Sequence, residues 1–411
     1  MIIYKYLFFI LLLYIGCNQK SPNQLLYDSP KLWAEPINDY LDVGVKEYPD
    51  GFDRRIGALE VFGDKLWIGY GDTRVNMGSV VPIEFRRFDE PSNKNIISTP
   101  VSAEGQGAKQ RTPTDTGEER IIPFNRIDDK LWQTGYDSNN DDELWTQSIP
   151  GLERLIQGNI FVLEGNNNDP VWRKLRTIPG GEHVHDLAYF EGSIYAVGSG
   201  ADHRREWDSG QIFRYLWRSG DMGKTFNTFH RVMYPDLHMG DTRYRALLTV
   251  GKTLYVFGYV NPIAKKGPME GRHVILRNGQ LEELKGSIGP VVVWKTWPLN
   301  QKLGVAIGNV GPGISRTFKI DTSSIQELSG WADRRIIYIT PSEKNGYWLV
   351  LSGTGTADET FAIHRFHESS IDTLLPVLNL GEKALSSIAL WHQDLYIGTA
   401  DGYILKADKK Q

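Results

Sequence analysis

The stretch LSSIALWHQDLYIGTADGYILKAD, residues 385–408, contains three short apolar segments separated by polar turns. The first segment (386–391) is followed by a polar turn, and the second (395–397) ends at Gly398. The third begins at Tyr403, after the turn Asp401-Gly402. Short apolar runs bounded by turn residues are typical of β-strands. The stretch therefore predicts an antiparallel unit of three strands.

The same order of strand, polar turn and strand ending in glycine occurs six more times. These copies are IGALEVFGDKLWIG (56–69), IPFNRIDDKLWQTG (122–135), VHDLAYFEGSIYAVG (184–198), YRALLTVGKTLYVFG (244–258), VWKTWPLNQKLGVAIG (293–308) and IIYITPSEKNGYWLVLSG (336–353). The spacing between their final glycines shrinks from 66 to 45 residues, which places the longer loops in the N-terminal half. We call these landmark glycines Gly69, Gly135, Gly198, Gly258, Gly308, Gly353 and Gly398.

Seven copies of a three- or four-stranded unit, without a long helical period, predict an all-β, seven-bladed β-propeller. We name the strands of each blade A (innermost) to D (outermost). The last copy ends after its third strand, and an apolar segment near residues 32–37 precedes the first copy. We expect this N-terminal segment to supply the missing outer strand, because such closure removes an exposed sheet edge. Two separate domains are the alternative, but no Pro/Gly/Ser-rich linker interrupts the repeats.

One turn inside the third copy carries a recognisable motif. Residues 219–226, Ser-Gly-Asp-Met-Gly-Lys-Thr-Phe, match the Asp-box pattern S-x-D-x-G-x-T-[FW], which occurs in sialidases and many other propellers. Its Ser and Asp side chains accept hydrogen bonds from the turn's own backbone, and its second glycine suits a positive φ. We expect a structural role at the turn between strands C and D.

Composition excludes several classes of protein. The 411 residues carry 46 Lys+Arg against 50 Asp+Glu, a net charge of −4, so a globally basic nucleic-acid-binding protein is excluded. A single Cys excludes a disulfide framework and a CxxC metal site. We expect a monomer without a nucleic-acid partner.

The N-terminus has the pattern of a targeting segment. Residues 1–16, MIIYKYLFFILLLYIG, carry one Lys before an apolar run that is too short to span a bilayer but fits a secretory signal. Because Cys17 follows Gly16, the segment resembles a bacterial lipoprotein signal, although Tyr14 stands where that motif prefers Leu or Val. The resemblance implies cleavage after residue 16, lipidation of Cys17, a polar tether over 17–30 and a propeller over 31–411. We expect an envelope lipoprotein, at the outer membrane or cell surface of a Gram-negative bacterium and bound to the membrane through its lipid. An ordinary signal peptide is the alternative.

Basic residues gather where the inner strands begin. When strand A is aligned on its central apolar residue, four consecutive blades carry a basic side chain four residues earlier: Arg55, Arg120, His183 and Arg243. Strand A begins at the mouth of the central channel, the usual ligand site of a propeller. The same strands and the B–C loops add further basic residues at this mouth: His185, Arg204, Arg205, Arg245, Lys265 and Lys266. This pattern predicts an anionic ligand, such as a sulfate ester or a uronate carboxylate.

Two histidines of blade three suggest acid–base chemistry. His183 opens strand A, and His203 lies 20 residues later in the B–C loop, so the hairpin between them returns the chain to the same face. An imidazole exchanges protons near neutral pH. His185 and Asp186 suggest a metal site instead, but no third ligand stands at a firm spacing, so we predict no cofactor and leave a divalent ion open.

A lipoprotein propeller with an Asp-box and a His pair across the A–B hairpin resembles the propeller polysaccharide lyases, with ulvan lyase families 24 and 25 the nearest. In those families one blade supplies the His pair, and the next supplies a Tyr on strand A and an Arg from the following loop. His183, His203 and Tyr244 fit this pattern, whereas the loop carries Lys265 and Lys266, with Arg272 only at its far end.

The resemblance implies β-elimination at a uronic acid of an anionic, sulfated polysaccharide such as ulvan. His183 or Tyr244 would act as base and acid, with His203 assisting. Arg243 and Arg245 would hold the carboxylate. Sulfate groups or neighbouring sugars would bind to Arg55, Arg120 and Arg205.

Two other functions fit the same mouth. A sialidase-type glycosidase also binds a carboxylate through arginines, and Arg54-Arg55-Ile56-Gly57 resembles a sialidase Arg-Ile-Pro segment, with Asp72 and Glu104 as the available carboxylates. A non-catalytic glycan-binding lipoprotein needs only the basic residues. An unsaturated uronate, an intact released sugar, or retention without product distinguishes the three.

Overall fold

The structure, a computed structural model, describes residues 26–410 with short internal gaps. The leader 1–16 and Cys17 lie outside the described residues, so signal cleavage, lipidation and envelope location stay predictions. No helix within the described ranges is long and apolar enough to cross a membrane. The gaps are 105–110, 139–155, 167, 234–240, 262–268, 287, 311–314, 329–333, 343–345, 355–358, 368–369 and 379–383.

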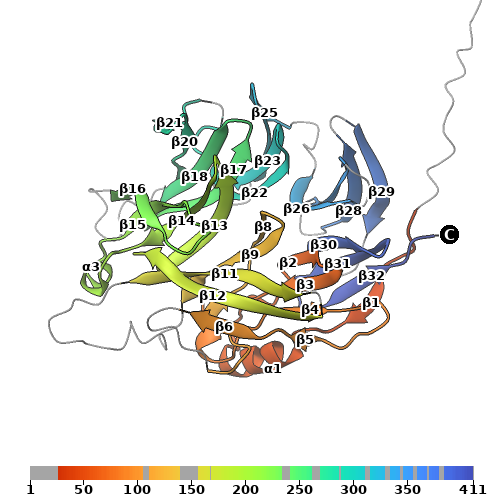
Figure 1. Cartoon of the computed structure of the whole chain (residues 1–411). Helices are drawn as coiled ribbons and strands as arrows, with labels where there is room; N and C mark the ends of the chain where they lie inside the picture. The colour runs from red at the N-terminus through yellow and green to blue at the C-terminus, as the bar shows by residue number, and fades with distance from the viewer. Residues whose placement is uncertain are drawn as a thin grey trace, which may run out of the picture.

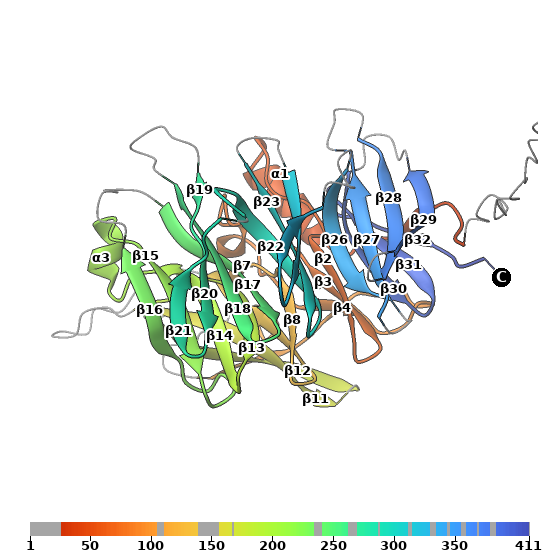
Figure 2. The same ribbon diagram turned by 90° about the horizontal axis from the view of Figure 1, so that it is seen from above.

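Seven sheets follow one another in chain order around a common centre (Figures 1 and 2), which confirms the predicted all-β, seven-bladed propeller. Blade one has β2 (Ala58–Phe62), β3 (Lys65–Gly69), β4 (Arg86–Phe88) and β5 (Ile97–Ser98). Blade two has β8 (Phe124–Ile127), β9 (Lys130–Thr134), β11 (Gln157–Asn166) and β12 (Asp169–Pro179), with β6 (Val101–Glu104) parallel to β12 at its edge. Blade three has β13 (His183–Phe190), β14 (Ser193–Gly200), β15 (Phe213–Ser219) and β16 (Asn227–Met233).

The C-terminal half is more regular. Blade four has β17 (Asp241–Val250), β18 (Thr253–Asn261), β20 (Val274–Arg277) and β21 (Gln280–Glu283), with β19 (Glu270–Gly271) beside β18. Blade five has β22 (Val292–Asn300), β23 (Leu303–Asn309), β24 (Ser315–Asp321) and β25 (Ile325–Glu327). Blade six has β26 (Arg335–Pro341), β27 (Trp348–Gly353), β28 (Phe361–His367) and β29 (Ser370–Leu378). Blade seven has β30 (Leu385–Trp391), β31 (Asp394–Thr399) and β32 (Ile404–Ala407).

Helices are few and short. Those among the described residues are α1 (Asn38–Glu47), the 3₁₀ turn η1 (Met77–Ser79) and α3 (Arg204–Asp208). The helix α1 lies between the closing strand β1 and blade one, where Tyr40 is fully buried and its hydroxyl donates to the carbonyl of Asp53 at 2.6 Å.

The seven landmark glycines are required for the same physical reason. Each lies on or directly after strand B, against the backbone or side chains of a neighbouring segment. A Cβ built on any of the seven would come closer than 3 Å to another atom. At Gly198 and Gly69 that atom is a backbone carbonyl oxygen, of His183 and Ile121 respectively, which cannot move aside. Close approach at the same point of every blade therefore makes the repeat visible in the sequence.

The ring closes as expected. The strand β1 (Lys31–Ala34) pairs antiparallel with β32, with Leu32 opposite Leu405, so the red N-terminal strand lies beside the blue C-terminal one (Figure 1). Trp33 is buried there, and its ring lies 4.5 Å from that of Phe88 in blade one and 4.8 Å from that of Tyr396 in blade seven. One side chain thus joins the two ends of the propeller.

The Asp-box forms the predicted turn between β15 and β16. The Ser219 hydroxyl accepts the N–H of Gly223 at 2.8 Å, and the Asp221 carboxylate accepts the N–H of Thr225 at 2.9 Å and its hydroxyl at 2.6 Å. Phe226 is buried in the core of blades two and three. The motif satisfies its own polar groups, and its role is structural.

Replacing Trp33 by Ala is expected to lower the free energy of unfolding by about 3–5 kcal/mol, the range for deleting a buried Trp. Leu32→Ala is the control on the same strand, because Leu32 is 50 % exposed and its loss is expected to cost less than about 1 kcal/mol. Denaturant unfolding of both variants measures the difference. Equal losses would show that closure does not depend on Trp33.

Candidate functional site

Two extra strands extend blade three across the mouth of the propeller. The inner edge of β13 pairs with β10 (Tyr136–Ser138), and β10 pairs with β7 (Glu118–Arg120). His183, Tyr136 and Arg120 are direct register partners in this ladder. Directly opposed residues of antiparallel strands project on the same side. The loops of three blades therefore present one row of polar side chains.

The centre of the site is a phenol and an imidazole that share one guanidinium group. Arg245 Nη1 on β17 donates to the hydroxyl oxygen of Tyr136 and lies 3.0 Å from Nδ1 of His185. The ring of Tyr136 lies 4.8 Å from that of His185 and 6.1 Å from that of His183. Because His185 and Arg245 each occupy the extra position of a β-bulge in strand A, both side chains turn toward this point.

The surrounding cations change the protonation of both groups. Burial raises the pKa of Tyr136, but the charges of Arg245, Arg120 and Arg243 outweigh it and hold that pKa below its ordinary value. Burial, together with the same arginines, also holds the pKa of His185 well below its ordinary value. The site therefore combines a neutral imidazole with a phenol that ionises unusually easily.

The hydrogen bond to Arg245 fixes the tautomer of His185. A guanidinium can only donate, so Nδ1 of His185 accepts, and the proton of the neutral ring is on Nε2. Nε2 is buried and has no hydrogen-bond partner among the described residues. His185 thus offers one N–H donor to a bound molecule.

His183 lies beside this centre, at the edge covered by α3. Its Nδ1 contacts the carboxylate of Glu182, and its ring lies 5.7 Å from that of Trp207 on α3. His203 is the N-cap of α3, where the carboxylate of Glu206 accepts its backbone N–H at 3.3 Å. The structure therefore places His203 at the start of α3, the helix whose Trp207 lies beside His183.

The basic residues expected at the mouth divide into three groups. Arg120 and Arg243 act electrostatically on Tyr136, and Arg55 acts on Arg120, so these lie at one centre with Arg245. Arg204 and Arg205 lie on α3, and Arg205 is exposed. Lys265 and Lys266 lie outside the described residues.

Tyr244 occupies a different place from the one the lyase resemblance implies. It lies on β17 between Arg243 and Arg245 and is fully buried. The guanidinium carbon of Arg214 lies 4.8 Å from its ring, and His230 is the neighbouring imidazole at 6.1 Å. Tyr244 packs in the core between blades three and four, whereas the β-bulge turns Arg245 toward Tyr136.

Two site residues do not follow from the strand-A alignment. Tyr136 directly follows the landmark Gly135, where strand B reaches the mouth, so its position after that glycine was the available signal. Lys295 on β22 lies on the innermost strand of blade five, beyond the four blades whose basic residues line up. Its amine lies over the rings of Trp297 and Tyr338, and the charges of Arg120 and Arg55 contribute to lowering its pKa to about 7, after burial.

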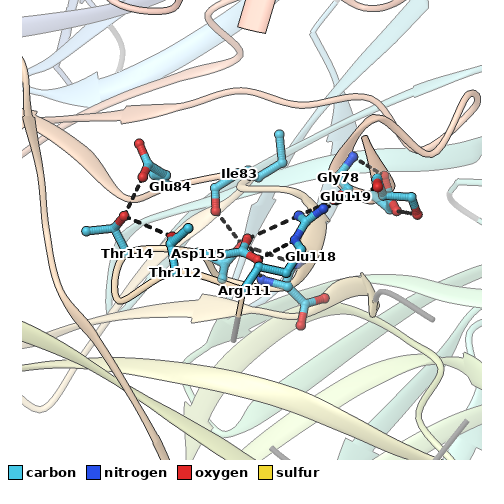
Figure 3. A network of polar contacts seen from close by, with 12 residues as sticks. Gly78, Ile83, Glu84, Arg111, Thr112, Thr114, Asp115, Glu118 and Glu119 are labelled. Carbon is cyan, nitrogen blue, oxygen red and sulfur yellow. Dashed lines mark hydrogen bonds and ion pairs between the residues drawn. The ribbon is translucent and has the colours of Figure 1, made fainter. Parts of the chain in front are cut away.

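A buried polar network holds β7 in place. Arg111 forms an ion pair with Asp115 at 2.8 Å and donates to the carbonyl oxygen of Gly78, while Glu119 accepts the N–H of Gly78 (Figure 3). On the other side, Asn159 donates to Glu118 at 2.6 Å, and Lys174 lies 3.9 Å from the same carboxylate. These contacts tie the strand that carries Arg120 to blades one and two, so Arg120 reaches the mouth on a rigid support.

Several buried polar atoms at the mouth have no partner among the described residues. They are Nε of Arg120, Nε2 of His185 and Oγ of Ser199. Buried polar atoms are normally hydrogen-bonded, and exceptions gather at functional sites. The orphaned donors are what a bound anion would satisfy.

The described residues contain no group of three His, Cys, Asp or Glu side chains arranged to hold a metal ion. Asp186, next to His185, instead accepts hydrogen bonds from Asn125 of blade two at 2.7 Å and from the N–H of Leu247 of blade four at 2.8 Å. It joins three blades. Asp72 is buried and forms an ion pair with Arg74 at 2.9 Å.

No protein-family model matches the chain, and no curated protein sequence matches it either. Solved structures that match are propellers of low identity. They include the β-propeller domain of the Trilobed protease from Pyrococcus furiosus (8 % identity, TM-score 0.46, 88 % of this chain and 97 % of that one) and the WD40 propeller of Doa1 (13 %, 0.45, 88 % and 95 %). A catalytically inactive virginiamycin B lyase from Staphylococcus aureus is another (12 %, 0.45, 87 % and 96 %). These likenesses concern the fold alone.

The phenol of Tyr136 is expected to ionise at a lower pH than an ordinary tyrosine. Replacing Arg245 by Met should raise the pKa of Tyr136 by about one pH unit or more, because it removes the guanidinium that donates to the phenol oxygen. Ultraviolet difference absorbance measures the ionisation of Tyr136 in the wild type and in Arg245→Met. The variant Tyr136→Phe identifies which part of the absorbance change belongs to Tyr136. Arg277→Met, in the same blade on β20, is the control and should leave the transition unchanged. An unchanged transition in Arg245→Met would contradict this electrostatic coupling.

Proposed function

We propose that this protein is a polysaccharide lyase that cleaves an anionic, uronate-containing polysaccharide, of the sulfated ulvan type, by β-elimination. The observation that carries the proposal is the shared guanidinium of Arg245, which contacts Tyr136 and His185 at the mouth of the propeller. Arg120 and Arg243 add positive charge at the same point. The group is suited to an acid–base reaction next to a carboxylate.

The chemical difficulty of the reaction is the weak acidity of the proton on C5 of the uronic acid. Neutralising the adjacent carboxylate stabilises the negative charge that develops when this proton leaves. Arg243 and Arg245 supply the charge, and the Nε2–H of His185 supplies a buried, unpaired donor. Donors placed in advance cost no reorganisation during the reaction.

Tyr136 is the base that this arrangement favours. Its phenolate removes the C5 proton, the C–H electron pair forms the C4=C5 double bond, and the C4–O bond breaks. The proton on Tyr136 then passes to the leaving oxygen, so one group serves as base and acid when both atoms lie on the same side of the ring. The lowered pKa of Tyr136 supports this role, because the phenolate is accessible nearer to neutral pH.

The remaining groups at the mouth suit substrate binding. Trp207 is partly exposed beside His183 and offers an aromatic face to a sugar ring. Arg55 and Arg205 are exposed and can contact further negative groups of the polymer. His183, held by Glu182, stands at the edge of the reacting centre as a second donor.

This assignment moves two roles from the residues that the resemblance implies. Tyr136 takes the role expected of Tyr244, because Tyr244 is buried against Arg214. His185 takes a position nearer the reacting groups than His203, which begins α3. The carboxylate-binding roles of Arg243 and Arg245 are retained.

A non-catalytic glycan-binding protein is the second candidate. The clustered cations at the mouth favour it equally, since they would retain an anionic polymer without any reaction. The two candidates differ only in the acid–base pair at Arg245. Formation of product therefore separates them.

Tyr136→Phe is expected to reduce formation of the ultraviolet-absorbing unsaturated uronate from ulvan by a factor of about 10²–10⁴, the usual worth of a general acid–base group. Tyr189→Phe is the control in the same blade, because Tyr189 is 47 % exposed and lies at the other end of β13. Tyr244→Phe decides between the two tyrosines and should keep its activity. Full activity in Tyr136→Phe, or its loss only in Tyr244→Phe, would reject the assignment.

A further inference from the structure

One row of side chains crosses blade three at its mouth end. His183 on β13 is the direct register partner of Tyr136 on one side and of Ser199 on β14 on the other, and Ser199 is in turn the partner of Arg214 on β15. Directly opposed residues of antiparallel strands project on the same side. Arg214, the second residue of β15 after the loop that carries α3, therefore belongs to the row that contains Tyr136.

Arg214 is a buried cation without an anionic partner among the described residues. It is only 9 % exposed, and its Nε and Nη1 have no hydrogen-bond partner in that part of the chain. Its guanidinium carbon lies 4.8 Å from the ring centroid of Tyr244 on β17, a cation–π contact that leaves the N–H donors unused. By contrast, Arg231 on the next strand, β16, pairs with Asp202 at 2.7 Å. The charge of Arg214 is thus held at the mouth but not compensated.

Ser199 places a second unused donor beside Arg214. Its side chain is fully buried, and its Oγ has no partner among the residues that the structure describes. Opposed residues have their Cβ atoms about 5 Å apart, so the hydroxyl and the guanidinium can reach one group. Buried polar atoms are normally hydrogen-bonded, and an arginine fork binds two oxygens of one anion. An oxyanion at this point would satisfy both side chains.

This position lies away from the reacting centre. Neighbouring strands are about 4.8 Å apart, so the backbone of Arg214 on β15 is about 14 Å from that of Tyr136 on β10. This separation is longer than one sugar ring, so Arg214 meets a different sugar unit from the one that reacts at Tyr136. Trp207 on α3, whose ring lies 5.7 Å from that of His183, flanks the row between its two ends.

We propose that Arg214 and Ser199 form a subsite for an oxyanion, a carboxylate or a sulfate ester, on a sugar unit next to the one that reacts. The polymer then lies across blade three, along the row from Tyr136 to Arg214. As a statement about the polysaccharide this rests on the proposed function, and it selects chains with a second negative group at a fixed distance from the cleaved bond. As an anion site it stands without any lyase activity.

The test compares variants of the purified protein by affinity electrophoresis through gels that contain ulvan. Arg214→Met is expected to weaken binding roughly 10- to 100-fold, because it removes hydrogen bonds from a charged donor. Ser199→Ala removes one neutral hydroxyl and should weaken binding roughly 2- to 10-fold. Arg218→Met is the matched control and should bind like the wild type, because Arg218 is exposed near the other end of β15 and donates to Ser193 at 3.0 Å.

Two further measurements separate binding from a structural role. Arg214→Lys keeps the charge without the guanidinium fork, so it should recover part of the affinity that Arg214→Met loses. In the assay of unsaturated product, Arg214→Met should raise KM and leave kcat nearly unchanged, because the subsite does not touch the reacting bonds. Calorimetric titration with glucuronate and with a monosaccharide sulfate distinguishes the two oxyanions, since only the one that occupies the subsite should lose affinity in Arg214→Met.

Each result supports or overturns the proposal. It is overturned if the wild type binds none of the three probes, or if Arg214→Met and Ser199→Ala, shown folded by thermal unfolding, bind them as the wild type does. Should Arg214→Met fail to fold, Ser199→Ala alone decides. If no polysaccharide yields an unsaturated product but binding still depends on Arg214, the proposed lyase function fails while the anion subsite stands. If product forms and Arg214→Met leaves both KM and binding unchanged, the subsite fails while the lyase function stands.

Discussion

The backbone ladder from β13 through β10 to β7 is the constraint on which the site depends. An inner strand of a propeller normally leaves its channel-facing edge unpaired, but here hydrogen bonds continue from His183 to Tyr136 and Arg120. This pairing holds side chains from separate blade connections at spacings fixed by a sheet. Cations held so close repel one another, and the buried ion pairs and hydrogen bonds around Glu118 and Glu119 stabilise the strand against that repulsion.

One electrostatic field sets two protonation states at the mouth. Positive charge favours the anionic form of Tyr136 and disfavours the cationic form of His185, so the same arginines lower the pKa of both. Under the proposed function, a phenol that ionises more easily beside a neutral imidazole suits proton abstraction next to a carboxylate. The pKa values of Tyr136 and His185 are therefore lowered by the same arginines. Loss of a single arginine would therefore disturb both.

The fold could be predicted from the sequence, because its strongest constraint recurs at fixed positions. The seven landmark glycines avoid contacts closer than 3 Å in every blade, and the Asp-box marks one C–D turn. Arg243 and Arg245 could be placed in the same way, since both lie on strand A of blade four, whereas Arg120, expected at the start of strand A in blade two, lies on β7 beside blade three. Tyr136 stands directly after the landmark Gly135, but its place in the site could not be predicted, because it depends on the long-range pairing of β10 with β13.

Tyr244 is the opposite case, because its position in the sequence suggests a place at the mouth but its side chain lies between two blades. A tyrosine between two mouth-facing arginines looks suited to the site, yet strand alternation directs it into the interface between blades. Lys295 could not be singled out from the sequence, because its contacts with the rings of Trp297 and Tyr338 appear only in the folded structure. Residues identified by type and spacing were predictable, whereas residues defined by their neighbours were not.

The pairing of β1 with β32 also determines when the propeller ring can close during synthesis of the chain. Residues 31–34 lie before all seven blades in the chain, whereas their partner strand, residues 404–407, lies at the end of blade seven. Trp33 gains its contact with Tyr396 only once blade seven has formed, and β32 gains its outer neighbour only when it pairs with β1. Contacts this distant in sequence form slowly, because the whole intervening chain must be ordered before they can be made. A chain that lacked residues 404–407 would therefore leave one edge of β1 and one edge of β31 without a partner strand.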